Sequence, residues 1–361
     1  MATTLHLTGP VLLSAEEVVD EIWVIDGRLS RTAPTGGEVT TVSGWVVPGL
    51  VDAHCHVGLG QHGAVDDETA EQQARTDRDH GTLLIRDAGS PADTRWMDGR
   101  SDLPQIIRAG RHIARTKRYI RGFAHEVEPD QLVERVRAEA RAGDGWVKLV
   151  GDWIDRDRGD LAPCWPVEVL TEAIAAAHEE GARVTAHCFG EESLYDFAAA
   201  GTDCIEHATD LEDETIRRFV VQGISIVPTL INIDTFPQIA EPAKEKFPEY
   251  HRHMIELYER RHATVAAAIE AGIDVYVGTD AGGSLAHGRA VDEMEALIRA
   301  GMSPAQALDA GTWASRRWLG RPAIEEGAPA DLLVLPRDPR TDLGALREAQ
   351  VLLNGVVVAG A

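Results

Sequence analysis

The stretch VVPGLVDAHCHV, residues 46–57, decides how this chain folds. Its run of branched apolar residues predicts a buried strand over residues 46–56. His54 and His56 are two residues apart, so in a strand both imidazoles project to the same side. From Val46 onward, short apolar runs of this kind alternate with longer helical patterns. This alternation is typical of βα units around a parallel sheet.

The apolar runs number eight, which is the strand count of one common α/β architecture. They cover residues 46–56, 82–87, 105–109, 146–150, 183–187, 203–207, 224–229 and 274–280. Helical patterns cover residues 130–142, 167–180, 191–200, 211–222 and 251–271, and several are followed by a glycine, namely Gly181, Gly201, Gly223 and Gly272. We therefore expect an α/β chain with a TIM-type (β/α)8 barrel.

The two ends of the chain carry hairpin patterns instead. Asp26-Gly27 separates two apolar runs near the start, and Asn354-Gly355 separates two near the end. Both dipeptides favour two-residue hairpin turns, but neither end has enough strands to be stable alone. We expect residues 1–44 and 320–361 to pair into one small β-sandwich, with the barrel formed by residues 45–319.

Composition restricts the location and the partners of the protein. With 35 basic and 59 acidic residues, the formal net charge of −24 would repel a phosphate backbone and disfavours nucleic acid as a partner. The first residues, MATTLHLTGP, lack the features of a secretory signal, and no apolar run reaches the length of a bilayer span. We expect a cytoplasmic protein that avoids membranes, acts on a small molecule and can form a homo-oligomer. Cys55, Cys188 and Cys204 lie in apolar runs and are expected to be buried thiols.

Potential metal ligands stand at or near the ends of five predicted strands: His54, His56, Lys148, His187, His207 and Asp280. One H-x-H pair alone means little, because 14 histidines in 361 residues give about 0.5 such pairs by chance. A second pair, His251 and His253, lies in a helical pattern, where residues two apart do not face each other, and is interpreted as structural or solvated. Barrel enzymes build their sites at the carboxyl ends of the strands, so the repeated placement predicts a metal centre.

The order H-x-H, Lys, His, His, Asp resembles the amidohydrolase superfamily, and within it the two-metal, lysine-bridged branch. PGLVDAHCHV resembles the first strand of that family, and EEGAPADLLVLPRDP, residues 325–339, resembles its C-terminal return. The short spacings resemble prolidase-like and imidazolonepropionase-like members. The resemblance implies that one divalent metal is held by His54, His56 and Asp280, and the other by His187 and His207.

The resemblance gives Lys148 an unusual role, because as a carbamate formed with CO2 it would bridge the two metals. An ordinary lysine has a pKa of about 10.4, and its ammonium group would repel two cations. The alternative is that Lys148 points away from the barrel mouth into a salt bridge, with one metal bound. Imidazole and carboxylate ligands suit zinc, and two metals can share and activate one water. Asp280 would take the proton of that water and deliver it to the leaving group.

Departures from family patterns reduce the number of reaction classes that the resemblance allows. Deaminases of the superfamily typically have glutamate three residues after the strand-five histidine, where this chain has Gly190. Prolidase-like members often have tyrosine two residues after that histidine, where Phe189 stands. The resemblance favours hydrolysis of an amide, peptide or cyclic C–N bond, with a dipeptide or an N-acyl amino acid as candidate substrate. The alternatives are an ester, lactone or phosphotriester hydrolase and, from another class, a non-catalytic scaffold.

A basic stretch follows the third predicted strand. Residues 111–121 contain five basic residues and no acidic one. Guanidinium groups bind carboxylates bidentately, so Arg118 and Arg121 are predicted to contact a substrate carboxylate. A solvated or subunit-facing loop is the alternative. His125 and His287 are predicted as further substrate contacts.

Overall fold

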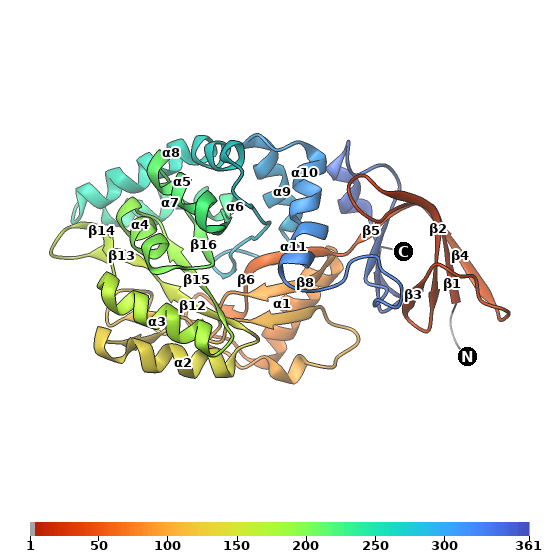
Figure 1. Ribbon diagram of the computed structural model, residues 1–361, viewed down its shortest axis with the longest axis horizontal. Helices are drawn as coiled ribbons and strands as arrows, with labels where there is room; N and C mark the ends of the chain where they lie inside the picture. Colours follow the sequence, from red (N-terminus) through yellow and green to blue (C-terminus); the bar gives the residue numbers. More distant parts are fainter. Residues whose placement is uncertain (1–3, 361) are drawn as a thin grey trace.

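The computed structural model describes residues 4–360, and an eight-stranded sheet lies at one end of the molecule, on the right in Figure 1. We call it the end sheet. In order of pairing, its strands are β21 (Val356–Ala359), β20 (Gln350–Leu353), β19 (Leu332–Leu335), β5 (Trp45–Pro48), β1 (Thr4–Leu12), β2 (Val18–Ile25) and β3 (Arg28–Ser30), with β4 (Val39–Ser43) beside β1. Segments from both ends of the chain therefore pair in one sheet.

Both predicted hairpins are present in the end sheet. β2 and β3 pair around Asp26 and Gly27, whose φ angles are 51° and 78°. β20 and β21 pair around Asn354 and Gly355, with φ angles of 51° and 73°. Two consecutive residues with positive φ are typical of the type I′ turn. A Cβ atom on Gly27 would lie 2.6 Å from the carbonyl oxygen of Asn354, so the two turns contact each other.

Two sheets with parallel strands form the rest of the strand framework. The first contains β18 (Ala281–Gly283), β6 (Leu50–Gly60), β8 (Thr82–Asp87) and β9 (Gln105–Arg108), with β7 (Gly63–Ala64) antiparallel to β6. The second contains β11 (His125–Val127), β10 (Ile113–Arg115), β12 (Trp146–Val150), β15 (Arg183–Cys188), β16 (Cys204–His207) and β17 (Ser225–Val227). Parallel strands that alternate with helices confirm the predicted α/β class.

The first predicted strand is wrong in one respect, because residues 46–56 do not form one strand. The chain divides at Gly49: β5 pairs with β19 in the end sheet, whereas β6 pairs with β8. A Cβ atom on Gly49 would lie 2.6 Å from the side chain of Leu83, so only a glycine fits where the chain crosses between the sheets. The apolar pattern continues through this point because both strands are buried.

The last predicted strand, residues 274–280, is also irregular. Val275 makes a single parallel bridge to Ile226 of β17. On the other side, Ala53 of β6 donates its backbone N–H to the carbonyl oxygen of Val277 at 2.8 Å. Too few consecutive hydrogen bonds form for a regular ladder, yet this segment connects the two parallel sheets.

Five predicted helices are present, with ends within three residues of those expected: α2 (Leu132–Ala142), α3 (Val167–Glu179), α4 (Glu191–Ala200), α5 (Asp213–Gln222) and α8 (Pro248–Ala271). The patterns did not predict α1 (Asp67–Asp79), α9 (Ala290–Arg299), α10 (Pro304–Ala310), α11 (Trp313–Trp318) or the short α6 (Leu230–Ile233) and α7 (Phe236–Ala240). In α1 the buried residues are Ala70, Ala74, Asp77 and Arg78, so its inner face lacks an apolar stripe.

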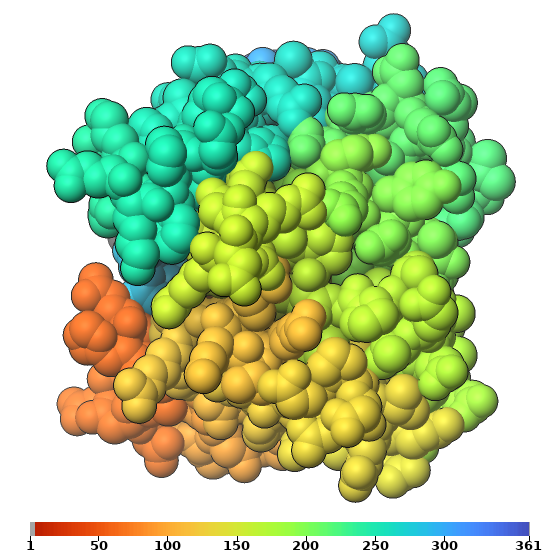
Figure 2. Space-filling view, turned by 90° about the vertical axis from the view of Figure 1, so that its left-hand side faces the viewer, coloured from red at the N-terminus to blue at the C-terminus, as the bar shows by residue number. Residues whose placement is uncertain are grey.

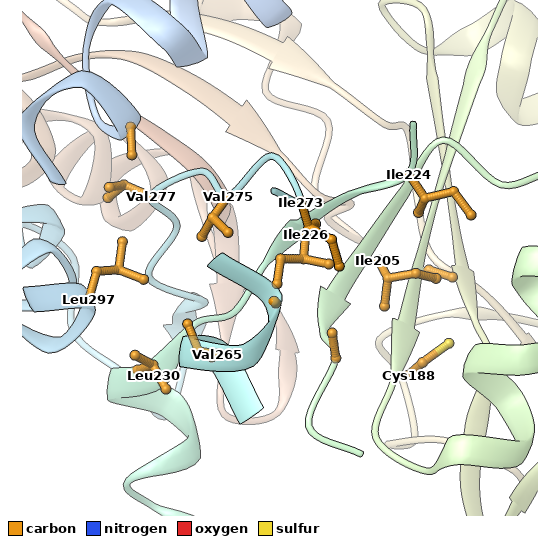
Figure 3. Packing of buried hydrophobic residues seen from close by; sticks show 14 of the residues in the cluster. Cys188, Ile205, Ile224, Ile226, Leu230, Val265, Ile273, Val275, Val277 and Leu297 are labelled. Atoms are coloured by element: carbon orange, nitrogen blue, oxygen red, sulfur yellow. The ribbon is translucent and has the colours of Figure 1, made fainter. Parts of the chain in front are cut away.

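An apolar core lies between the second parallel sheet and the helices outside it. Figure 3 shows Ile205 and Ile226 of this sheet in one cluster with Val265 of α8 and Leu297 of α9. The four cysteines are buried and form no disulfide: Cys55, Cys164, Cys188 and Cys204. Within residues 4–360, no helix is both long enough and apolar enough to cross a membrane.

Candidate metal centre

The structure brings the six predicted ligands together. They are His54 and His56 on β6, Lys148 on β12, His187 on β15, His207 at the end of β16 and Asp280 directly before β18. Five of these side chains are buried, and that of Asp280 is 19% exposed. Strands of a parallel sheet end at the same edge, which is why residues so distant in sequence meet here.

The backbone is strained at this edge. Seven described non-glycine residues have positive φ, and four of them lie here: His207 (69°), Ala208 (51°), Thr229 (48°) and Asp280 (58°). Each such residue costs about 1–3 kcal/mol and persists only where the surrounding structure enforces it. Strain concentrated at the strand ends makes this edge the candidate for a functional site.

The hydrogen bonds of the H-x-H pair determine where its lone pairs point. His56 donates from Nδ1 to the carbonyl oxygen of Gly89 at 2.6 Å, and Nδ1 of His54 lies 2.7 Å from a carboxylate oxygen of Glu206. Both Nε2 atoms therefore carry lone pairs in the neutral imidazoles. They lie 3.2 Å apart, and each is within 3.2 Å of Oδ1 of Asp280. Three acceptors that converge without a proton between them fit a bound cation.

The pKa values of the nearby groups fit this donor set, except that of His54: burial alone would lower this pKa, but the charge of Glu206 raises it. Burial alone would raise the pKa of Asp280, but the charges of the neighbouring histidines and hydrogen bonds to them hold it well below its usual range. Burial holds the pKa of His187 well below its usual range and lowers that of His207 to about 3. An ionised carboxylate and neutral imidazoles are the forms that bind metal ions.

Lys148 is 1% exposed, and its Nζ has no hydrogen-bond partner in the described part of the chain. Burial lowers the pKa of this amine. The predicted alternative, in which Lys148 turns away into a salt bridge, is not observed. A buried amine without a partner beside histidine ligands fits the bridging carbamate, because the neutral form of lysine is the one that reacts with CO2.

The histidines of the second predicted metal lie beside those of the first. The ring centroids of His187 and His207 are 4.8 Å apart, and those of His54 and His207 are 5.3 Å apart. Ligand atoms of His54, His207 and Asp280 all lie within 4.8 Å of one another. His207 therefore lies beside both the His54–Asp280 group and His187.

A buried ion pair behind His54 was missed by the sequence interpretation. Glu206, fully buried, contacts Nδ1 of His54 and accepts a hydrogen bond from Arg86 at 2.6 Å. The Arg86 guanidinium lies 4.6 Å from the ring centroid of Trp146 and 4.9 Å from that of Trp318. The sequence did contain a signal for this pair, because Arg86 and Glu206 are oppositely charged residues within two otherwise apolar predicted strands.

Two further side chains at the site do not lie at the end of a predicted strand. Asn232 of α6 donates from Nδ2 to Oδ2 of Asp280 at 2.6 Å. His112 is buried, with its ring centroid 4.9 Å from that of His56. Asn232 lies in a short helix that no periodicity indicates, so only the tertiary structure identifies it.

A pocket of about 220 Å³ opens onto the cluster and is lined by His56, His187 and Asp280 among others. Its wall includes Trp153 of the hairpin β13 (Asp152–Asp155) and β14 (Asp160–Pro163). Figure 2 shows this side of the molecule, where the yellow-green segment of the hairpin lies between the amber segment before it and the teal segment of α7 and α8. Figure 1 places the hairpin at the end of the molecule opposite the end sheet.

Contrary to the prediction, Arg118 and Arg121 of the basic stretch do not line this pocket. Arg118 donates hydrogen bonds to Asp155 and to the carbonyl oxygens of Trp153 and Ala162, at 2.7–2.9 Å. It therefore anchors the hairpin β13–β14. Arg121 is exposed and does not line the pocket.

The two histidines predicted as substrate contacts also lie elsewhere. His125 is 3.1 Å from Glu139 in a separate side pocket. His287 donates from Nδ1 to a carboxylate oxygen of Asp77 on α1, at 2.8 Å, and thereby holds the segment after β18 against that helix. Neither lines the pocket that contains the metal ligands, so we remove both from the proposed site.

Comparisons with known proteins agree with this geometry. The amidohydrolase family matches residues 45–358. An uncharacterized protein of Mycobacterium tuberculosis is 53% identical over 356 residues, which cover 98% of this chain and 95% of that protein. The solved structure of a Xaa-Pro dipeptidase with bound methionine superposes with a TM-score of 0.82 at 22% identity, covering 99% of this chain and all of that chain. A putative prolidase from Bifidobacterium longum gives a TM-score of 0.81 at 24% identity, with 99% and 94% covered. The chain therefore belongs to the amidohydrolase family and is an enzyme that acts on C–N bonds.

Proposed function

We propose that the protein hydrolyses an amide C–N bond of a small molecule with two divalent metal ions. The observation that carries this proposal is the donor set: two imidazole lone pairs and a carboxylate oxygen converge within 3.2 Å, beside a buried lysine amine without a partner. Such a cluster is unfavourable unless a cation fills it. The names of the Xaa-Pro dipeptidase and the prolidase support the choice of a C–N bond.

When bound, the two metals would polarise the scissile carbonyl and acidify a water molecule. His54, His56 and Asp280 would hold one ion, His187 and His207 the other, and the carbamate of Lys148 would bridge them. Zinc suits these ligands best.

The residues around the proposed metal positions have different functions in this mechanism. Asp280 accepts the proton of the attacking water at Oδ2 and later delivers it to the leaving nitrogen. Asn232 orients that carboxylate through its hydrogen bond to Oδ2. Glu206 keeps the proton of His54 on Nδ1, so that Nε2 stays free to bind metal.

The finer points of the architecture are part of the same proposal. We propose that the two parallel sheets close into one eight-stranded barrel through residues 274–280 and the neighbouring strand edges. In this proposal, residues 4 to about 48 and about 320 to 360 form the second, smaller domain around the end sheet. A cytoplasmic location and a homo-oligomeric state remain predictions.

Replacement of Lys148 tests the function. Protein purified without chelator should contain close to two equivalents of metal and should hydrolyse members of a panel of dipeptides, N-acyl amino acids and simple amides. Lys148→Ala should lose both metal and activity, with partial recovery when formate or acetate fills the vacated space. Lys244, an exposed lysine, provides the control variant Lys244→Ala. Intact metal content and activity in Lys148→Ala would exclude the bridging role.

A further inference from the structure

The pocket that leads to the metal centre has an aromatic wall. Five aromatic side chains line it: Tyr119, Phe123, Trp153, Phe189 and Tyr250. The ring centroids of Tyr119 and Trp153 are 4.9 Å apart, and that of Phe189 lies 4.2 Å from that of His187. The wall therefore continues up to a predicted metal ligand, so a group next to the scissile bond must contact aromatic rings.

The rim of the pocket is apolar as well. Ile120 and Ile239 both line it and are 41% and 45% exposed. Large apolar side chains at the surface of a monomer commonly mark a binding site when they continue into a pocket. Here they extend the aromatic wall outward and present no group that would attract an ion.

Cationic side chains are absent from this pocket. Among the described residues that line it, none is lysine or arginine. Arg118, the nearest candidate in sequence, is held by Asp155 and by two carbonyl oxygens of the hairpin. Arg111 donates to the carbonyl oxygens of Phe123 and Gly122. A substrate carboxylate placed beyond the scissile bond would therefore be desolvated without a cationic partner, which disfavours its binding.

The size of the pocket matches one ring. Its volume is about 220 Å³, whereas an apolar cavity of about 150 Å³ is enough for benzene. A phenyl ring and the adjoining amide therefore fit together. Apart from the predicted metal ligands, the polar groups that line the pocket are neutral: the side chains of Gln61, Asn232 and Ser284, the hydroxyls of Tyr119 and Tyr250, and the indole N–H of Trp153.

From this wall we infer the substrate class of the proposed hydrolase: a neutral amide that carries an uncharged aromatic ring beside the scissile C–N bond. This inference rests on the proposed function. It replaces the expectation that the basic stretch reads a substrate carboxylate. Stacking and edge contacts with Tyr119, Trp153 and Phe189 provide recognition, because aromatic pairs attract each other beyond the area that they bury.

Binding of two matched ligands to the metal-loaded protein tests the inference. N-benzylacetamide should bind at least tenfold more tightly at pH 7 than its 4-carboxy analogue, measured by titration calorimetry. Equal or tighter binding of the carboxylate, or binding of neither ligand, would overturn the inference. Hydrolysis of both ligands is followed in parallel. Tight binding of the aromatic amide without turnover of any amide would contradict the proposed function and leave the pocket specificity intact.

Three variants locate the effect. Trp153→Ala should weaken binding of N-benzylacetamide at least tenfold, while Tyr195→Ala, an exposed aromatic residue outside the pocket, should not change it. Ile239→Lys places a cation at the rim and should tighten binding of the carboxy analogue severalfold. Unchanged affinities in both pocket variants would place the binding site elsewhere.

Discussion

The ion pair behind His54 leads to a prediction about metal affinity. Glu206→Gln keeps the size of the side chain but removes the charge that lies 2.7 Å from Nδ1 of His54 and balances Arg86. Both Glu206 and Arg86 are fully buried. Loss of one partner of a buried pair costs about 3–5 kcal/mol of folding stability. Loss of a carboxylate behind a metal-binding histidine weakens metal binding about 10–100-fold.

The assay must separate these two effects. Zinc affinity is measured by competition with a chromophoric chelator, and the free energy of unfolding by urea titration of the metal-free protein. Arg86→Met combined with Glu206→Gln removes both charges and should recover much of the stability, whereas zinc affinity should stay low. Glu139→Gln is the control, because this buried carboxylate contacts none of the predicted metal ligands. It should leave zinc affinity unchanged. A zinc affinity within twofold of the wild type in Glu206→Gln would refute the reasoning.

Three further predictions follow from the site and its supports. Asp280→Asn should lower kcat by about 10²–10⁴, because the proton acceptor is lost, with the fold unchanged by circular dichroism; near-normal turnover would exclude Asp280 as the base. Burial alone would lower the pKa of His287, but the charge of Asp77 and the hydrogen bond to it raise that pKa above 6.5. The pair therefore stabilises the fold fully below pH 6.5 and loses this contribution as the pH rises through the raised pKa, so the difference in unfolding free energy between wild type and His287→Asn should shrink from pH 6 to pH 9. A constant difference would contradict the pairing. Gly278→Ala should cost about 1–3 kcal/mol, since its Cβ would lie 2.8 Å from the backbone nitrogen of His54; urea denaturation with an unchanged midpoint would count against this close contact.

Local sequence patterns were sufficient to predict the fold class, the two hairpins and the candidate metal ligands of this protein. Alternating apolar runs predicted the α/β class, and Asp26-Gly27 and Asn354-Gly355 predicted the two hairpins, because backbone preference over two residues decides such turns. The six candidate ligands were also readable from sequence, because each lies at or near the end of an apolar run. The α1 helix was not readable, because its buried face carries small and charged residues instead of an apolar stripe.

Only the tertiary structure decided which other groups reach the site. Arg118 and His287 lie near predicted strand ends in sequence, yet the first anchors a hairpin and the second pairs with Asp77. Conversely, Asn232 contacts Asp280 from a position that no local pattern marks, and the charge of Glu206 within an apolar run did not by itself show that it contacts His54. Strand-end ligands follow from the direction of one strand, which the local sequence specifies. Ion pairs and pocket walls depend on the packing of segments far apart in the chain, and no single segment contains that information.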